Sequence, residues 1–414
     1  MTESVVIAGG GLAGGAAACL LARAGRKVVL LERETGPVDK ICGEFLSIEA
    51  QTILRDLGLD LLSLGAQPID RVRLIRRGAC VETALPFGAL GLSRKTLDEA
   101  LLLRAASLGA QVRRGQTINE IKDAEPITLN VAGREPVTTA TLFLATGKHE
   151  VRGERRSLRA EPEDLVGFKA YFQLAPRQDD ALRGYVEVMM WPDAYAGLQR
   201  VEGGRANLCM LVKRSRLLRA GGNWDILLQD LCATQPHLAS RLQGATALSP
   251  RPISIFRVPF GFVHRASKSD KVGVFRLGDQ IGVIPSFTGD GMSIALHSAI
   301  VASDYCLRGL SAAAYHRQMR KDIAPQIACA TGLYGLMANS TGQALIMMMT
   351  RHWPRLLALM AALTRIPERA LGKSSVLDLG QRVSSDGDTS PVCLERNPRN
   401  DSHFMVKLRV KTSN

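Results

Sequence analysis

Residues 4–34, SVVIAGGGLAGGAAACLLARAGRKVVLLERE, decide the fold of the N-terminal part of the chain. An apolar run at 5–8 is followed by a glycine-rich turn at 9–14, an Ala- and Leu-rich stretch, and a second apolar run at 28–31. This order predicts a strand, a tight turn, a helix and a second, parallel strand. Such a unit places a pyrophosphate on the N-terminus of its helix, where free peptide N–H groups attract anions.

Three glycines and one acid give this unit its predicted chemistry. Gly9 lets the chain turn sharply, Gly11 lets the backbone approach the phosphates, and Gly14 lets the helix pack closely on the strand. Glu32 ends the second strand, roughly 20 residues on, where a carboxylate can accept hydrogen bonds from ribose hydroxyls. Together these features favour a dinucleotide site over a glycine-rich turn in some other α/β protein.

Length, charge and cysteine spacing limit the class of protein. A chain of 414 residues exceeds the size of a single hydrophobic core, so we expect two joined domains. A net charge of +14 favours anionic partners such as dinucleotides, phosphate- or thioester-bearing acyl or prenyl groups, and anionic membranes. No basic stripe is interleaved with aromatic residues, which argues against nucleic acid. Eight cysteines without CxxC spacing predict no metal site and no disulfide framework.

The pattern of apolar residues predicts an α/β protein, α+β overall. Short strand pieces lead to Thr146-Gly147 at the carboxyl edge of a parallel, Rossmann-like sheet, where ligands bind. From 166 to 212 the period changes to two, which indicates an antiparallel substrate domain. A second glycine-flanked helix start, 289–291, follows Gly278-Asp279 and suits another part of the same ligand. The predicted divisions are 1–68, 93–165 and 272–310 for the nucleotide domain, 69–92 and 166–271 for the substrate domain, 311–372 for C-terminal helices, and 373–414 for a flexible tail.

The predicted C-terminal helices have two interpretations. Residues 343–349 are apolar all round, residues 353–363 are apolar beside a basic cluster, and Pro354 separates the two segments. They are either a buried helix pair that closes the substrate domain or a surface that grips lipid. No window reaches the ~18 apolar residues of a membrane span, and the MTESVV start leaves no room for a signal peptide. We therefore expect a cytoplasmic protein, with peripheral contact at the inner face of a membrane as the lipid-gripping alternative.

Two further residues also have open interpretations from the sequence. The turn Cys42-Gly43-Glu44 comes just after the nucleotide unit, where it can fold back over a bound cofactor. Cys42 is either a small buried hydrophobe or a residue beside the reactive centre. Arg94 follows Ser93, a good helix N-cap, and composition alone makes it a solvated first-turn residue.

Together these motifs resemble the flavoprotein monooxygenase superfamily typified by p-hydroxybenzoate hydroxylase, and especially its geranylgeranyl-reductase-like branch. GGGLAG with Glu32, RKTLD at 94–98, and the segment from Gly278-Asp279 through Pro285 to Gly291 follow the family's order. The resemblance implies an FAD cofactor whose ribose is held by Glu32 and whose pyrophosphate or ribityl chain lies near Arg94. It places Asp279 on the ribityl chain and the backbone of 289–292 at the pyrimidine edge of the flavin.

The cofactor-binding set implied in this way covers the whole length of FAD. It comprises Gly9, Gly11, Leu12, Ala13, Gly14, Glu32, Arg33, Cys42, Gly43, Arg94, Gly147, Gly278, Asp279, Pro285, Gly289, Gly291 and Met292. Cys42 and Pro285 are also the candidates for positions next to the reacting flavin ring. The Cys42-Gly43-Glu44 turn is similar to the CGG or CGE turn of prenyl reductases.

The resemblance implies an oxidoreductase and leaves several reactions open. The first is a monooxygenase that hydroxylates or epoxidises an apolar polyketide-, lipid- or isoprenoid-like substrate through a flavin C4a-hydroperoxide, the substrate being free, carrier-bound or membrane-associated. The alternative is a reductase that transfers hydride from flavin N5 to an isoprenoid or activated C=C bond. A halogenase and a non-enzymatic flavin protein are lesser alternatives. NAD(P)H is a candidate transient reductant, although Thr146-Gly147 stands where the hydroxylases carry a DG dipeptide.

Overall fold

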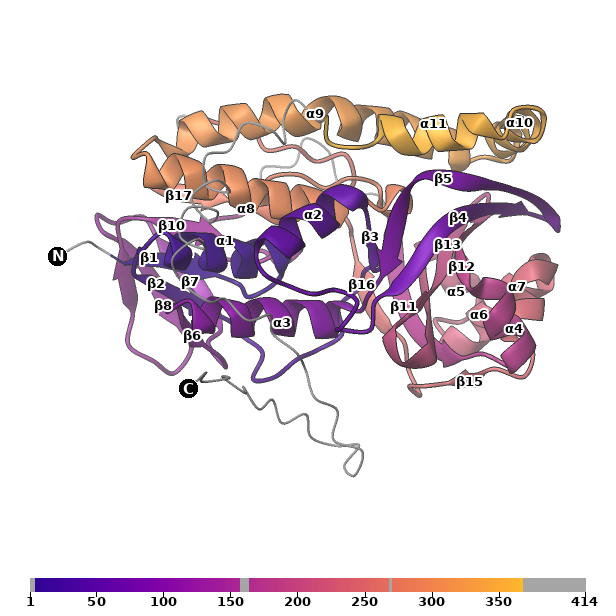
Figure 1. Ribbon diagram of the computed structural model, residues 1–414, viewed down its shortest axis with the longest axis horizontal. Helices are drawn as coiled ribbons and strands as arrows, with labels where there is room; N and C mark the ends of the chain where they lie inside the picture. The colour runs from indigo at the N-terminus through magenta and orange to yellow at the C-terminus, as the bar shows by residue number, and fades with distance from the viewer. Residues whose placement is uncertain (1–3, 157–163, 268–269, 368–414) are drawn as a thin grey trace, which may run out of the picture.

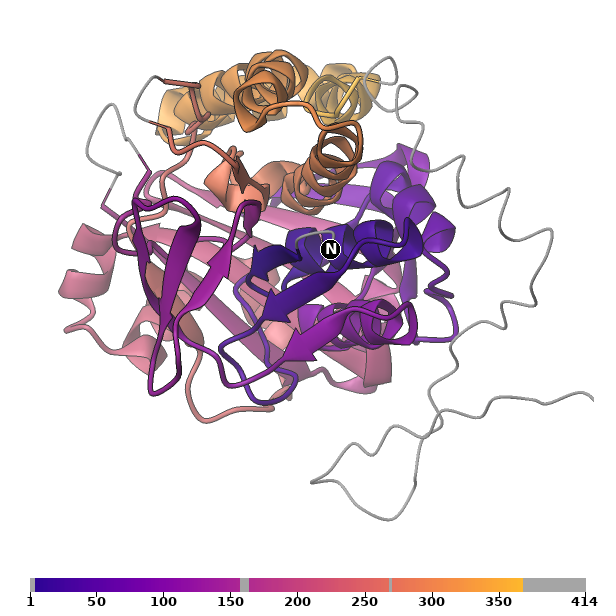
Figure 2. The ribbon, with the colours of Figure 1, turned by 90° about the vertical axis from the view of Figure 1, so that its left-hand side faces the viewer.

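The computed structural model describes residues 4–156, 164–267 and 270–367 (Figure 1). The predicted flexible tail, 373–414, lies outside the described residues. The described chain forms two large sheets side by side, with a layer of C-terminal helices above them (Figures 1 and 2). The predicted α/β class, with a parallel sheet and a second, largely antiparallel sheet, is confirmed.

The parallel sheet has the strand order β17-β10-β1-β2-β6. Its strands are β1 (Val5–Ala8), β2 (Val28–Leu31), β6 (Gln111–Arg113), β10 (Leu142–Leu144) and β17 (Val274–Arg276). One face is covered by α1 (Leu12–Arg23), α3 (Arg94–Ser107) and α8 (Gly291–Leu307), with α2 (Ile48–Asp56) beside α8. The other face packs on a small antiparallel sheet of β7 (Ile118–Lys122), β8 (Ile127–Val131) and β9 (Val137–Thr139). Cover on both faces explains why β1 and β10 are continuous apolar runs.

The second sheet has the order β15-β11-β14-β13-β12-β4-β5-β3, and β16 also pairs with β11. Its strands are β3 (Phe45–Leu46), β4 (Gln67–Arg76), β5 (Ala79–Gly91), β11 (Leu165–Gln173), β12 (Gly184–Trp191), β13 (Ala194–Val201), β14 (Arg205–Lys213), β15 (Thr246–Ala247) and β16 (Ile253–Phe256). The pair β12–β4 is parallel, so residues 67–91 join the meander edge to edge. β5 pairs with β4 along most of its length, across a bulge at 69–71.

Short helices cover the outer face of the second sheet (Figure 1). They are α4 (Pro176–Leu182), α5 (Arg214–Arg219), α6 (Trp224–Thr234) and α7 (Pro236–Leu242). Three of them, α4, α5 and α7, have only six or seven residues and are too short to show a helical period in the sequence.

The C-terminal helices are α9 (Ala312–Met337), α10 (Ser340–His352) and α11 (Arg355–Leu363). α10 and α11 are separate, as predicted from Pro354, which sits directly before α11. α9 lies over α8 and β17, whereas α10 and α11 extend over β4 and β5 (Figure 1). None of the helices in the described part of the chain is long and apolar enough to cross a membrane.

Candidate active site

A cavity of about 810 Å³ runs from the carboxyl edge of the parallel sheet, across the inner face of the second sheet, to α9, α10 and α11. Of the residues predicted to bind a cofactor, all but Gly14 and Pro285 line it. Gly14 instead packs under the glycine turn, and Pro285 is buried just before the lining residue Ser286. The cavity therefore joins three segments that are far apart in the sequence.

The glycine turn forms a cradle that larger residues would fill. A Cβ on Gly9 would lie 2.5 Å from the Ala145 carbonyl oxygen, and one on Gly14 would lie 1.9 Å from the Gly9 carbonyl oxygen. Gly9 also has φ of 106°, a backbone conformation that L side chains rarely adopt. Gly11 is the residue directly before α1, and in the described part of the chain no side chain caps this helix end. The first peptide N–H groups of α1 are thus available to a phosphate.

Glu32 is held at the rim of this cradle by backbone donors. The Gly10 N–H donates to Oε2 at 2.6 Å and the Glu34 N–H donates to Oε1 at 3.0 Å. The side chain is buried yet lines the cavity. Its carboxylate is therefore fixed in place, with remaining lone pairs for the hydroxyls of a ribose.

Arg94 is a cavity residue and not the solvated first-turn residue that composition suggested. It makes a bidentate ion pair with Asp98, at 2.8 and 2.9 Å. Lys40, which the sequence did not single out, reaches the same Asp98 carboxylate at 2.9 Å. A Cβ on Gly11 would lie 3.2 Å from Arg94 Nη2 and 3.7 Å from Lys40 Nζ. Two cations that share one carboxylate therefore stand over the N-terminus of α1, which suits a diphosphate.

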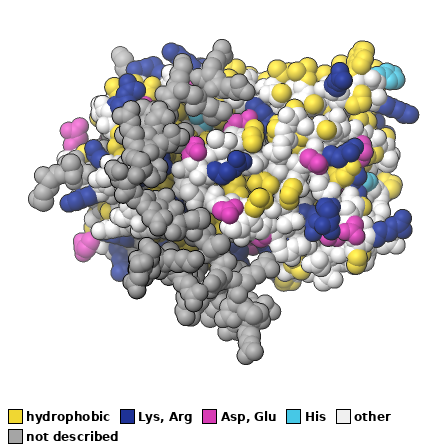
Figure 3. All heavy atoms as spheres, viewed as in Figure 1, with side chains coloured by type: hydrophobic (Ala, Val, Ile, Leu, Met, Phe, Trp, Pro, Cys, Tyr) yellow, Lys and Arg dark blue, Asp and Glu magenta, His cyan; other side chains and the backbone are white. Residues whose placement is uncertain are grey.

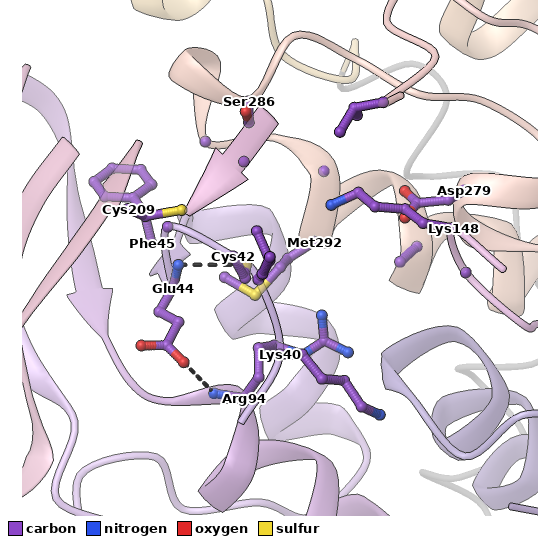
Figure 4. A pocket seen from close by; sticks show the side chains of 18 of the residues that line it. Lys40, Cys42, Glu44, Phe45, Arg94, Lys148, Cys209, Asp279, Ser286 and Met292 are labelled. Carbon is purple, nitrogen blue, oxygen red and sulfur yellow. Dashed lines mark hydrogen bonds between the residues drawn. The ribbon is translucent and has the colours of Figure 1, made fainter. Parts of the chain in front are cut away.

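The loop after β10 places another cation in the cavity. Gln280 donates to the carbonyl oxygens of Gly147 and His149 at 2.9 and 3.0 Å, and Arg156 donates to that of Lys148 at 2.8 Å. These bonds fix the backbone while the Lys148 side chain reaches into the pocket on the side of Asp279 (Figure 4). Lys148 is a second cation that sequence reasoning missed.

The turn 40–44 is fastened to the second sheet through its carbonyl groups. Lys169 of β11 donates to the Lys40 carbonyl at 3.0 Å, and Gln199 of β13 donates to the Glu44 carbonyl at 2.8 Å. Asn207 of β14 donates to the carbonyls of Cys42 and Gly43 at 3.1 and 3.0 Å. Within the described part of the chain, nothing accepts from the peptide N–H groups of Cys42 and Gly43. Both residues line the cavity, so these donors are available to a ligand.

The Glu44 side chain anchors the same turn and is fully buried. It forms an ion pair with Lys169 and accepts from the Tyr171 hydroxyl at 2.8 and 2.9 Å. It also accepts from the Arg94 N–H at 2.8 Å, the bond drawn in Figure 4. Burial raises the pKa of Glu44, and the Lys169 ammonium opposes that rise. Glu44 also has φ of 63°, an unusual conformation for a residue other than glycine that these contacts hold in place.

The sequence did not single out Lys169, Tyr171, Gln199 or Asn207 as residues of the site. The signal that it offered for them is the period-two alternation of the strands that carry them. Lys169 and Tyr171 lie on the same face of β11, and Gln199 and Asn207 are paired neighbours in β13 and β14. Polar residues at buried, core-facing strand positions require partners. The sequence could show that partners were needed, but not that the turn 40–44 supplied them.

The far half of the cavity is apolar. It is lined by Val72, Leu74, Leu85, Val186, Val188, Met190, Ile255, Val258, Phe260, Phe287, Leu333, Met337, Ile346, Leu357 and Met360. Gly197 leaves room on the sheet, because the one described atom within 4 Å of a Cβ built there is the Cys209 carbonyl oxygen, at 3.9 Å. Between the two halves lie Cys42, Cys209 and Ser286 (Figure 4). The Ser286 hydroxyl is hydrogen-bonded to that of Tyr195, which also lines the cavity. Burial raises the pKa of the Cys209 thiol to about 12, so it remains protonated.

The loop 289–291 is tied to the end of α11. Asp290 is buried and accepts from the Thr364 hydroxyl at 3.2 Å, and its other carboxylate oxygen has no hydrogen-bond partner among the described residues. Arg365 lies 3.8 Å from that oxygen and 2.5 Å from Glu49. Burial raises the pKa of Asp290 to about 7. The C-terminal helices are thereby connected to the loop that the family resemblance assigns to the flavin.

A second group of titratable residues, His264, Asp270 and His316, lies outside this cavity. His264 Nε2 is 3.0 Å from the Asp270 carboxylate and His316 Nδ1 is 3.7 Å from it. Because His316 Nε2 accepts the Arg276 N–H at 3.2 Å, the proton of this imidazole sits on Nδ1 and faces Asp270. A metal-ligating histidine would instead donate its other N–H. The geometry is that of a carboxylate between two imidazole N–H groups, and we assign it no metal.

Comparisons with known proteins identify the ligand of the cradle. Residues 2–142 match the family model described as "FAD binding domain". The menaquinone reductase of Mycobacterium tuberculosis is 26% identical over 320 residues, which are 73% of this chain and 76% of that protein. Squalene monooxygenase 1,2 of Brassica napus is 26% identical over 324 residues, 72% of this chain and 60% of that protein. The flavin-dependent brominase Bmp2 has a similar fold, with a TM-score of 0.73 at 16% identity over 92% of this chain and 98% of Bmp2.

The fold, the cradle and these matches define the protein as an FAD-dependent oxidoreductase. The predicted FAD cofactor is confirmed, and the cradle fits it, with glycines under the phosphates, a fixed acid at the rim and cations over the helix end. More particularly, it is residues 2–142 that match this FAD binding domain.

Proposed function

We propose that the protein is an FAD-dependent monooxygenase that hydroxylates or epoxidises a long, apolar, isoprenoid-like lipid. The observation that carries this proposal is the continuity of one cavity from the FAD cradle to an apolar channel ending at α9, α10 and α11. A compact aromatic substrate would not need a channel of that extent, whereas a flexible chain would. Menaquinone and squalene, the compounds in the names of two relatives, are both isoprenoid lipids.

The bound flavin supplies the redox chemistry, including the activation of dioxygen. The protein positions the cofactor and the substrate and excludes water from the site. Glu32, Arg94, Lys40 and Lys148 would hold the nucleotide and diphosphate part. The N–H groups of Cys42 and Gly43 would face the ring. The aliphatic side chains of β4, β12 and α9–α11 would orient the substrate and exclude water, which limits unproductive side reactions with solvent.

Turnover in labelled dioxygen tests the proposed reaction. The holoenzyme is reduced and supplied with squalene or a menaquinone in detergent under ¹⁸O₂. We expect a product that carries one ¹⁸O atom, and we expect no product under nitrogen. Product formation without dioxygen, and without oxygen in the product, would refute the monooxygenase.

The second candidate is a reductase of an isoprenoid C=C bond, as in the geranylgeranyl-reductase-like branch. It is favoured by the buried Tyr195 hydroxyl, whose pKa burial raises and which Ser286 holds between the two halves of the cavity. A neutral phenol there could donate the proton that alkene reduction requires. The similarity to a menaquinone reductase over 73% of the chain supports the same candidate.

One variant separates the candidates. Tyr195→Phe should slow an anaerobic alkene reduction by a factor on the order of 10²–10³ and leave an oxygenation nearly unchanged, since oxygenation needs no proton donor at that position.

We also propose NAD(P)H as the reductant. Stopped-flow mixing of the oxidised holoenzyme with NADH, and separately with NADPH, tests this proposal. If the flavin absorbance is not bleached by either compound, both are excluded as the reductant.

A further inference from the structure

The helices α10 and α11 present an apolar face to the outside of the molecule. Its large side chains are Leu345, Met348, Trp353, Leu359 and Leu363, which are between 44% and 66% exposed. α11 has no buried residue over its whole length. In Figure 3 hydrophobic side chains gather along the upper edge, over α9–α11, beside basic side chains and a histidine. These residues form one exposed apolar face and are not scattered, because four of them lie on α10 and α11 and Trp353 lies at the junction between the two helices.

The helices that carry this face bear charges of a single sign. Between residues 323 and 367 the sequence contains no Asp or Glu. Arg351, His352 and Arg355 are exposed at the junction of the two helices, next to Trp353. Arg365, at the other end of α11, points inward to Glu49. An apolar face with a basic end and no acid complements an anionic lipid surface.

The inner side of the same helices lines the substrate channel. Ile346 of α10 and Leu357 and Met360 of α11 are cavity residues, as are Leu333 and Met337 of α9. A single layer of helix therefore separates the exposed apolar face from the channel that leads to the FAD cradle.

We propose that the α10–α11 face docks on an anionic membrane and that the apolar substrate passes from the bilayer into the channel between these helices. The role as an entrance rests on the proposed lipid substrate, whereas docking itself does not. A membrane fits better than a second copy of this chain, because two copies of a basic, acid-free face would repel each other. With this face buried to the headgroup level, Trp353 would lie at the interface, where tryptophan is favoured.

Flotation of the full-length holoenzyme with vesicles tests docking without any turnover. We expect binding to vesicles of phosphatidylcholine with 30% phosphatidylglycerol, weaker binding to phosphatidylcholine alone, and a blue shift of tryptophan emission on binding. Leu359→Gln with Leu363→Gln should lower the partition coefficient roughly tenfold or more. Arg351→Gln and Arg355→Gln should each lower it about fivefold, with a smaller effect at high salt.

The control is a pair of equally exposed leucines on other elements, Leu62→Gln with Leu218→Gln. All four leucines are exposed, so each variant should fold. The proposal is overturned if the wild type does not bind anionic vesicles, or if the control pair weakens binding as much as the α11 pair. It is also overturned if vesicle binding is absent and Leu359→Gln with Leu363→Gln abolishes a dimer in solution, because the face would then be a contact between two copies of the chain. Vesicle binding with no oxidation of a lipid would leave docking intact and refute the proposed function.

Discussion

Replacing Lys169 by Met should destabilise the protein strongly, because it leaves the carboxylate of Glu44 buried without its cation. Both side chains are almost fully inaccessible to solvent, and the ammonium also holds the Lys40 carbonyl at 3.0 Å. The Tyr171 hydroxyl and the Arg94 N–H remain as neutral donors to Glu44. They reduce the loss but do not replace the charge.

The expected cost follows from the burial of the pair. Breaking a buried ion pair on one side costs about 3–5 kcal/mol, which is a large share of the roughly 5–15 kcal/mol that stabilises a typical domain. The double variant Glu44→Gln with Lys169→Met removes both charges and should recover most of that loss. Lys213→Met, at an exposed position, is the control and should be close to neutral.

The loss should depend on pH with a defined sign. Burial already raises the pKa of Glu44, and removing Lys169 removes the attraction that opposed this rise. An acid whose pKa is higher in the folded state binds more protons when folded. The free energy of unfolding of Lys169→Met is therefore greatest at low pH and falls as pH rises above the unfolded pKa of about 4.3. The double variant has no such acid and should lack this added dependence.

Urea unfolding of the holoenzyme, followed by circular dichroism at pH 5 and pH 8, measures both effects. We expect Lys169→Met to lose more stability at pH 8 than at pH 5. The flavin absorbance should also change, since the turn 40–44 loses one of its three side-chain anchors. A loss below about 1 kcal/mol at pH 8, or a double variant no more stable than the single one, would refute the reasoning.

Three further outcomes are expected. Glu32→Gln should weaken FAD binding roughly tenfold in a fluorescence titration of the apoprotein, because the amide cannot accept both backbone donors and ribose hydroxyls. Gly197→Leu should bind FAD normally but lose about tenfold or more in kcat/KM for a long lipid, since its side chain fills open cavity; equal loss of FAD affinity would contradict this. The pKa of Asp290 is raised to about 7, so the free energy of unfolding of the wild type falls as pH rises toward that value. An asparagine side chain does not titrate, so the stability of Asp290→Asn relative to the wild type should increase from pH 5 to pH 8. Unfolding midpoints of both proteins that shift in parallel over this range would contradict that prediction.

The sequence predicted those parts of the site that depend on local spacing. Gly9, Gly11 and Glu32 act within one strand–turn–helix unit, so their relation follows from a few consecutive residues. The segment from Gly278-Asp279 to Gly291 was recognised for the same reason, as a strand end followed by a helix start. The boundaries of the domains and the roles of individual cofactor-binding residues stay predictions.

The tertiary structure decided where the long-range partners lie. Lys169, Gln199 and Asn207 are ordinary strand residues until the second sheet comes within hydrogen-bonding distance of the turn 40–44. Register and sheet packing create that distance, and no local pattern encodes it.

The same holds for the C-terminal helices, which the sequence left between a buried pair and a lipid-gripping surface. The pattern of α11 shows leucines on most sides, so periodicity could not say which of them would face the channel and which the solvent. That division is set by the position of α10 and α11 over β4 and β5. Their inner side chains line the cavity, and no protein in the described part of the chain covers the outer ones. The sequence by itself thus determined the cradle for FAD, because consecutive residues build it, while the substrate channel and its apolar outer face exist only where distant segments meet.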